Sequence, residues 1–165
     1  FALFPTLPAI FDHLAHGSQG DGYYRAQLGR ALEVADPLYY GLTIGAAALW
    51  LLYVVFARTG LVRKLAVTAT IQVGLLAGLV VPYAGELAQG PVKAAGLKAA
   101  EIHEPIIFWN FSTVPSFSVY RQSVTLLGTP TPGQLALTRI DRLPADARVE
   151  EVFRQGGVLL VRRLP

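Results

Sequence analysis

Two apolar blocks without charge constrain the fold of this chain more than any other feature of its sequence. Residues 37–57 and 65–85 are each 21 residues long and contain no Asp, Glu, Lys, Arg or His. At a helical rise of about 1.5 Å per residue, each block spans about 30 Å, which is the thickness of the hydrocarbon core of a bilayer. The sequence therefore predicts two transmembrane helices, at 37–57 and 65–85.

A pair of buried helices in a water-soluble domain is the alternative. Helices of a soluble core are usually shorter and carry a polar stripe, whereas these blocks are apolar on all sides. Charged residues make up only 15% of the chain, well below the quarter that is usual in soluble domains. Small residues within the blocks also suit close helix contacts in lipid. These residues are Gly41, Gly45, Ala46, Gly74 and Gly78.

The link between the two blocks indicates their orientation. Residues 58–64 read RTGLVRK and contain three cations and no acid. Short cytoplasmic loops of membrane proteins are rich in Lys and Arg. We therefore expect 58–64 to be a cytoplasmic loop, with 13–36 and 86–165 on the opposite, extracytoplasmic side.

The region before the first block is expected to hold the end of another span. Residues 1–12 begin FALFPTLPAIF, and the chain contains no methionine, so we expect 1–12 to end a truncated transmembrane span of a longer polytopic protein. In the loop 13–36, glycines and Ser18 indicate a turn. Residues 23–35 fit either a short amphipathic helix in the membrane interface or an ordinary connector.

The remainder of the chain predicts a small α/β domain. Pro82, near the end of the second span, is expected either to kink the helix or to start its exit, because proline removes a backbone donor, and a helix is expected over 90–102. A strand over 105–111, a turn at Pro115 and one helical turn through Tyr120 follow. Four further strands are expected at 123–128, 134–140, 149–155 and 157–164, the last two joined by a Gly156–Gly157 hairpin.

Few residues offer catalytic or metal chemistry. His13 and His16 have a spacing that suits zinc on a helix, but no third ligand is near in sequence, so no metal site is expected. His103 has serines within reach in sequence, but no Gly-x-Ser-x-Gly elbow accompanies them, so a serine hydrolase is disfavoured. These serines are Ser112, Ser116, Ser118 and Ser123.

Charge and cysteine content narrow the classes of partner. The net charge is +3, but the basic residues do not form a patch interleaved with aromatics, so no nucleic-acid partner is expected. The chain has no cysteine, which excludes disulfides and thiolate metal sites. Asn110 begins an N-glycosylation sequon, a pattern too short to be informative alone.

One ordered series of motifs carries a family resemblance. Residues 90–125 read GPVKAAGLKAAEIHEPIIFWNFSTVPSFSVYRQSVT, followed by GQLALTRIDRLP and a terminal FRQGGVLLVRR. The series, with its PSFSVY segment at 115–120, resembles the end of the bacterial relatives of the protein O-mannosyltransferases, which include the lipid A aminoarabinose transferases. The layout is similar over 38–165, and the motifs cover about forty residues.

The resemblance implies the carboxy-terminal part of a GT-C type glycosyltransferase in the bacterial inner membrane. Such an enzyme moves a sugar from a polyprenyl-phosphate donor to a lipid or protein acceptor. The acidic catalytic residue of that family lies in an early extracytoplasmic loop that has no counterpart here. The resemblance therefore implies no catalytic residue and no cofactor in this part of the protein. This part would supply the scaffold and the terminal domain, and its partners would include membrane lipids and the rest of the parent chain.

Tyr120 and Arg121 are the two candidate substrate contacts. They follow the PSFSVY motif on the side of the membrane where the donor phosphate is expected, and arginine binds phosphate through two hydrogen bonds. An ion pair or a contact at a helix end is the alternative role for Arg121.

Two other classes of function compete with the transferase. The first is a non-catalytic membrane-anchored interaction module, in which the apolar helices are only an anchor. The second is a part of a transporter, which predicts ionisable residues at the bilayer midplane. Gln72 is the only strongly polar residue in the second block, so we rank the transporter last.

Overall fold

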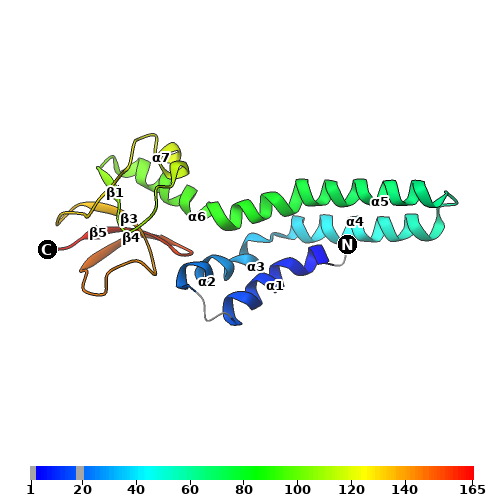
Figure 1. The fold of residues 1–165 in the computed structure, drawn as a ribbon, viewed down its shortest axis with the longest axis horizontal. Coiled ribbons are helices and arrows are strands. Elements are labelled where there is room, and N and C mark those ends of the chain that lie inside the picture. Colours follow the sequence, from blue (N-terminus) through cyan, green and yellow to red (C-terminus); the bar gives the residue numbers. More distant parts are fainter. Residues whose placement is uncertain (1–2, 18–20) are drawn as a thin grey trace.

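The computed structural model describes residues 3–17 and 21–165 and shows an elongated molecule (Figure 1). The predicted turn at Ser18 lies outside these residues. The helices are α1 (Leu3–Gly17), α2 (Gly22–Leu28), α3 (Ala31–Val34), α4 (Pro37–Phe56), α5 (Leu61–Leu75), the π-helical turn η1 (Leu76–Val80), α6 (Val81–Ile102) and α7 (Pro115–Arg121). The strands are β1 (Ile106–Phe108), β2 (Leu126–Leu127), β3 (Leu135–Arg139), β4 (Val149–Gln155) and β5 (Val158–Arg163).

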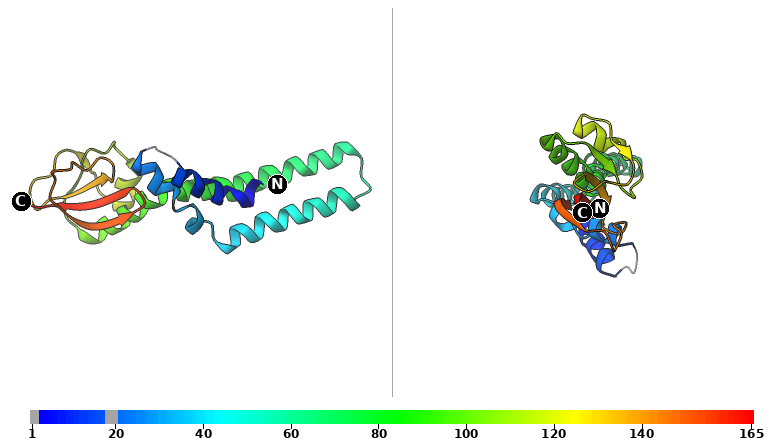
Figure 2. Two further views of the ribbon diagram at one scale, coloured as in Figure 1. Left: turned by 90° about the horizontal axis from the view of Figure 1, so that it is seen from below. Right: turned by 90° about the vertical axis from the view of Figure 1, so that its left-hand side faces the viewer.

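Helices α4 and α5, with η1, form the apolar hairpin, which projects at one end of the molecule (Figures 1 and 2). Asp36 caps α4, because its carboxylate accepts a hydrogen bond of 2.8 Å from the Tyr39 amide. The two helices are tied together near their link, where Trp50 Nε1 donates to Thr68 Oγ1 at 2.8 Å. Helix α4 agrees with the predicted helix 37–57 to within one residue.

The link between the two helices is shorter than the predicted loop 58–64. Helix α5 already begins at Leu61, with Gly60 as its cap, so Lys64 lies in the first helical turn. From there the Lys64 ammonium donates a hydrogen bond of 2.6 Å to the carbonyl oxygen of Val54. This carbonyl lies in the last turn of α4, where carbonyl groups lack a donor within the helix.

The second half of the hairpin continues without a break into the domain. Together α5, η1 and α6 form one helix of 42 residues, Leu61–Ile102. The exit of the chain from the helix at Pro82, one of the two alternatives, is therefore wrong, and residues 90–102 are helical as expected but do not begin a new helix. In η1 the Val81 amide donates to the Leu76 carbonyl five residues earlier, and this wider turn accommodates the proline ring that would clash with the carbonyl of Gly78.

A five-stranded mixed sheet forms the other end of the molecule and confirms the five predicted strands. Its order is β2-β1-β3-β5-β4; β1 runs parallel to β2 and β3, while β5 is antiparallel to β3 and β4. The predicted Gly156–Gly157 hairpin joins β4 to β5. Strand β1 ends at Phe108 rather than at 111, because Asn110 turns the chain with a φ of 52°.

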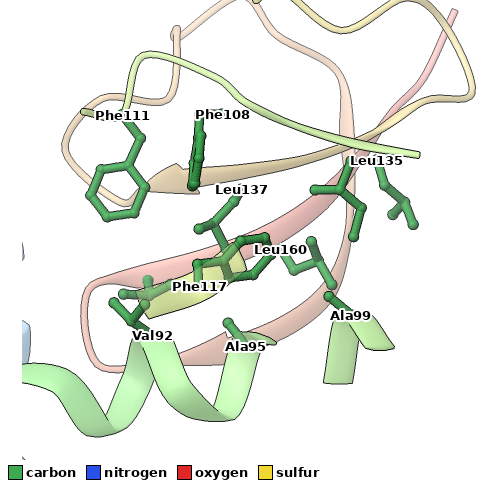
Figure 3. Close-up of a cluster of buried hydrophobic side chains, with 11 residues drawn as sticks. Val92, Ala95, Ala99, Phe108, Phe111, Phe117, Leu135, Leu137 and Leu160 are labelled. Carbon is green, nitrogen blue, oxygen red and sulfur yellow. The ribbon is translucent and has the colours of Figure 1, made fainter. Parts of the chain in front are cut away.

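The main core lies between one face of this sheet and helices α6 and α7. Figure 3 shows Val92, Ala95 and Ala99 of α6 pointing toward sheet residues such as Leu160. Phe117 of α7, from the PSFSVY motif, is fully buried in the same core. On the other face of the sheet a smaller cluster is covered by residues of the 140–149 segment. Its buried members are Trp109, Ala136, Leu159 and Val161.

Helices α1 to α3 pack at the junction between the hairpin and the domain. The Tyr83 hydroxyl of α6 donates to the Ala31 carbonyl at 3.1 Å, and the Tyr39 hydroxyl of α4 donates to the Phe4 carbonyl at 2.7 Å. The segment 23–35 is two short helices rather than one, and α1 runs on to Gly17, past the predicted span end at residue 12.

Gly96 is required for the close packing of α7 on α6. A Cβ at this position would lie 2.8 Å from Tyr120 Cβ and 3.1 Å from the Phe117 carbonyl oxygen. We expect Gly96→Ala to destabilise the domain by about 1–3 kcal/mol, because the two helices must separate to accept a methyl group.

Gly85→Ala in the same helix is the matched control, since a Cβ there meets nothing within 4 Å. It should be neutral or stabilising by about 0.5–1 kcal/mol, because alanine favours helix. Denaturant unfolding, followed by Trp109 fluorescence in a Trp50→Phe background, measures the free energy of unfolding of both variants. Equal stability of the two variants would contradict the packing argument.

Candidate functional site

Arg121 makes internal contacts at the end of α7. Its Nη2 donates to the Glu104 carbonyl oxygen at 2.7 Å, and its Nη1 donates to Thr125 Oγ1 at 3.0 Å. The guanidinium is half-buried, and this burial lowers the pKa of Arg121 from its ordinary value. The side chain thus joins α7 to the segments that lead into β1 and β2, which agrees with the structural alternative for this residue.

Tyr120 and Arg121 also lie far along α6 from the apolar hairpin. Tyr120 packs on Gly96, and Arg121 bonds to the chain just beyond Ile102. At about 1.5 Å per residue, Ile102 is about 25 Å beyond Gly85, where the second apolar block ends. The guanidinium of Arg121 is thus engaged within the domain, and a substrate contact by Tyr120 or Arg121 stays a prediction.

The other polar residues considered from the sequence do not gather into a catalytic group. Ser116 Oγ donates to Gln89 Oε1 at 3.3 Å, and His103 Nδ1 lies 2.8 Å from the Glu101 carbonyl oxygen. Glu104 instead pairs with Arg162 at 2.9 and 3.1 Å, and this pair lowers the pKa of the Glu104 carboxyl. Within residues 3–17 and 21–165 no three His, Cys, Asp or Glu side chains are grouped as metal ligands.

An ion-pair network joins α2 to the end of β3. Arg139 pairs with Asp21 and, at 2.8 Å, with Asp141, and its guanidinium lies 4.0 Å above the centre of the Tyr23 ring. Burial opposes the charge on Arg139, but hydrogen bonds from the guanidinium to Asp141 and Asp21 raise its pKa. The Tyr23 amide, and then Asp141 and Arg139, lower the pKa of Asp21. The contacts therefore favour the charged forms of Arg139 and Asp21 and join α2 to the domain.

The Gly156–Gly157 turn touches the same helix. A Cβ on Gly157 would lie 2.9 Å from the Tyr23 carbonyl oxygen and 3.0 Å from its Cα. A Cβ on Gly156, which has a φ of 54°, would lie 2.5 Å from Gln27 Oε1. Glycine is needed here for the close approach to α2 as well as for the hairpin turn.

A cavity of about 400 Å³ lies beside this contact, between α1, α2 and α6. Its walls are mainly apolar or aromatic. They are formed by Phe11, Tyr23, Tyr24, Gln27, Leu28, Ala84, Leu87, Ala88 and Gln89. Gln27 is only 5% exposed, and neither its amide nitrogen nor its amide oxygen has a hydrogen-bond partner among the described residues.

Sequence reasoning missed this junction. Arg139 is one arginine in a strand and Gln27 one glutamine in a short helix, and neither belongs to a motif. The dipeptide Gly156–Gly157 was the only signal, and it was interpreted as a turn alone. The contacts of Arg139 with Asp21 and of the Gly156–Gly157 turn with α2 join segments distant in sequence, so no local pattern identifies them.

Comparison with protein-family models, with curated proteins and with solved structures yields no match to this chain. Membership of the glycosyltransferase family therefore stays a prediction.

Replacing Arg121 separates the two roles considered for it. We expect Arg121→Ala to destabilise the domain by about 1–3 kcal/mol, because the Glu104 carbonyl and the Thr125 hydroxyl lose their donor. Arg154→Ala on β4 is the control. The Arg154 side chain is half exposed, and its ion pair with Glu151 is long, at 3.9 Å, so its removal costs little. Its effect on denaturant unfolding should be small. An Arg121→Ala protein of unchanged stability would contradict the structural role.

Proposed function

We propose that the apolar hairpin spans a membrane and carries the α/β domain on the extracytoplasmic side. The supporting observation is the exposure of large apolar side chains along both helices. Leu49 is 69%, Phe56 74% and Val62 81% exposed, and only 11% and 6% of the most apolar windows of the two long helices are buried. A soluble core helix would be mostly buried.

Lipid provides the missing contacts of this surface. Removing a Leu, Val or Phe side chain from water contributes about 1.5–3 kcal/mol, and both long helices expose many of them. The link 57–60 and the first turn of α5 carry Arg58, Arg63 and Lys64, which favours the cytoplasmic side for this end.

Single cysteines test this orientation, because the chain has none of its own. We expect Thr59→Cys in the link to react with an impermeant maleimide only after the cytoplasmic side is opened. Thr131→Cys, in the exposed segment before β3, should react in intact cells. The opposite pattern would overturn the orientation, and free reaction of Leu49→Cys in intact cells would overturn the span.

We further propose that the chain is the carboxy-terminal part of a polyprenyl-phosphate-sugar glycosyltransferase. Support comes from the resemblance over 90–125 and from the order of elements there: helix α6, strand β1, helix α7 and strand β2. Phe117 of the PSFSVY motif packs in the core and Tyr120 packs on Gly96. The motif thus shapes the domain, which is consistent with a scaffold role for this part and with catalytic residues elsewhere in the parent.

Sugar transfer by the intact parent protein tests this proposal. Membranes containing it should transfer radiolabelled sugar from a polyprenyl-phosphate donor to a lipid or protein fraction, and membranes without it should not. Absence of transfer with a panel of donor sugars would contradict the proposal. It would favour the alternative, a membrane-anchored interaction module without catalytic activity.

A further inference from the structure

The link between α4 and α5 carries positive charge that no acid in this part of the sequence balances. Arg58 lies in the link, and Arg63 and Lys64 lie in the first turn of α5. No Asp or Glu occurs from residue 37 to residue 85. Like charges this near to one another repel, so an anion placed among the three cations would lower their energy.

These cations have donors available for an anion. Lys64 Nζ donates to the Val54 carbonyl oxygen, and this bond uses only one of the donors of the ammonium group. Arg58 and Arg63 are exposed, and neither forms a hydrogen bond or an ion pair with any residue that the structure describes. A guanidinium binds a phosphate group through two parallel hydrogen bonds, so both arginines suit a phosphate.

Large exposed apolar side chains flank this charge. Phe56, the last residue of α4, is 74% exposed, and Leu61 and Val62, the first residues of α5, are 73% and 81% exposed. A soluble anion, or an acidic and polar protein segment, would leave these side chains in water. The hydrocarbon chains of a phospholipid would cover them. Charge and apolar surface together favour an anion that carries hydrocarbon chains.

The position of the link agrees with such a ligand. The link lies at the end of the hairpin farthest from the domain (Figure 1). With the hairpin in the bilayer as proposed above, this end is at the depth of the lipid headgroups. The Tyr53 hydroxyl lies 3.2 Å from Thr59 Oγ1, and tyrosine is enriched at this depth. A zwitterionic headgroup would bring a further cation to the link, whereas an anionic headgroup brings none.

We propose that the link between α4 and α5 binds the headgroup of an anionic phospholipid. The phosphate lies among Arg58, Arg63 and Lys64. The hydrocarbon chains cover the apolar side chains at the adjoining helix ends. The inference rests on the membrane placement of the hairpin and is independent of sugar transfer.

Quenching of Trp50 fluorescence by brominated lipids tests the proposal on the full protein. Trp50 is about 9 Å before Phe56 along α4, and Trp109 in the domain is buried and gives a constant background. Nanodiscs contain phosphatidylglycerol and phosphatidylcholine in equal amounts, and the chains of only one of the two lipids are brominated. The apparent binding constant of phosphatidylglycerol beside Trp50 should exceed that of phosphatidylcholine at least about fivefold, which is the effect of one basic residue near an anionic headgroup.

Charge-removing variants show whether the link itself selects the lipid. Arg58→Gln and Arg63→Gln should each weaken the preference for phosphatidylglycerol, and the double variant should bring the ratio of the two binding constants to about one. Both side chains are exposed and unpaired among the described residues, so the fold should be unaffected. Arg154→Gln removes the same charge from β4 in the domain and should leave the preference unchanged.

Three outcomes would overturn the proposal while the membrane placement stands. The first is equal quenching by the two brominated lipids, and the second is a preference that the double variant keeps. The third is loss of the preference when inorganic phosphate replaces chloride at equal ionic strength, which would mean a site for a free anion.

Failure of the membrane placement gives a different result. If the hairpin lies outside the bilayer, neither brominated lipid quenches Trp50, and the lipid site is then overturned together with the span. Sugar transfer is measured separately on the parent protein, so its presence or absence does not change the interpretation of the quenching.

Discussion

The continuity of one helix, Leu61–Ile102, is the constraint on which the rest of the structure depends. Its first half forms one side of the apolar hairpin, and its second half supplies the stripe of Val92, Ala95 and Ala99 that covers the sheet. At about 1.5 Å per residue it is about 63 Å long. Because no flexible linker separates the halves, the position of the domain follows directly from the direction of the hairpin.

The sequence predicted most of the elements because their signals are local. Two blocks without charge identified the apolar helices, and short apolar runs separated by turn residues, with Gly156–Gly157 as a hairpin signal, identified the strands. The sequence left open whether the helix ends at Pro82, for a physical reason. Proline ends a helix when nothing compensates for its missing donor, but here η1 widens the turn, and Tyr83 and Leu87 just after it pack in one buried cluster with Ala31 and Tyr39.

The junction could not be predicted in the same way. Asp21, which pairs with Arg139, and the α2 residues that contact the Gly156–Gly157 turn lie more than a hundred residues earlier. Arg121 depends on a backbone carbonyl, that of Glu104, and a backbone group has no signature in the sequence. The residues that bring the hairpin, α2 and the sheet together are therefore common types in ordinary segments, and only the folded chain distinguishes them.

The π-helical turn η1 also sets a phase between the two halves of the long helix. A π turn contains one residue more than the α-helical repeat, and one residue corresponds to a rotation of about 100° around the axis. Without this residue, the face of α5 that meets α4 would be unchanged, while α6 and the sheet packed on it would be rotated away from α2. The π turn at Leu76–Val80 thus sets the rotation between the two halves of the helix, so that one face of α5 meets α4 while a different face of α6 meets the sheet.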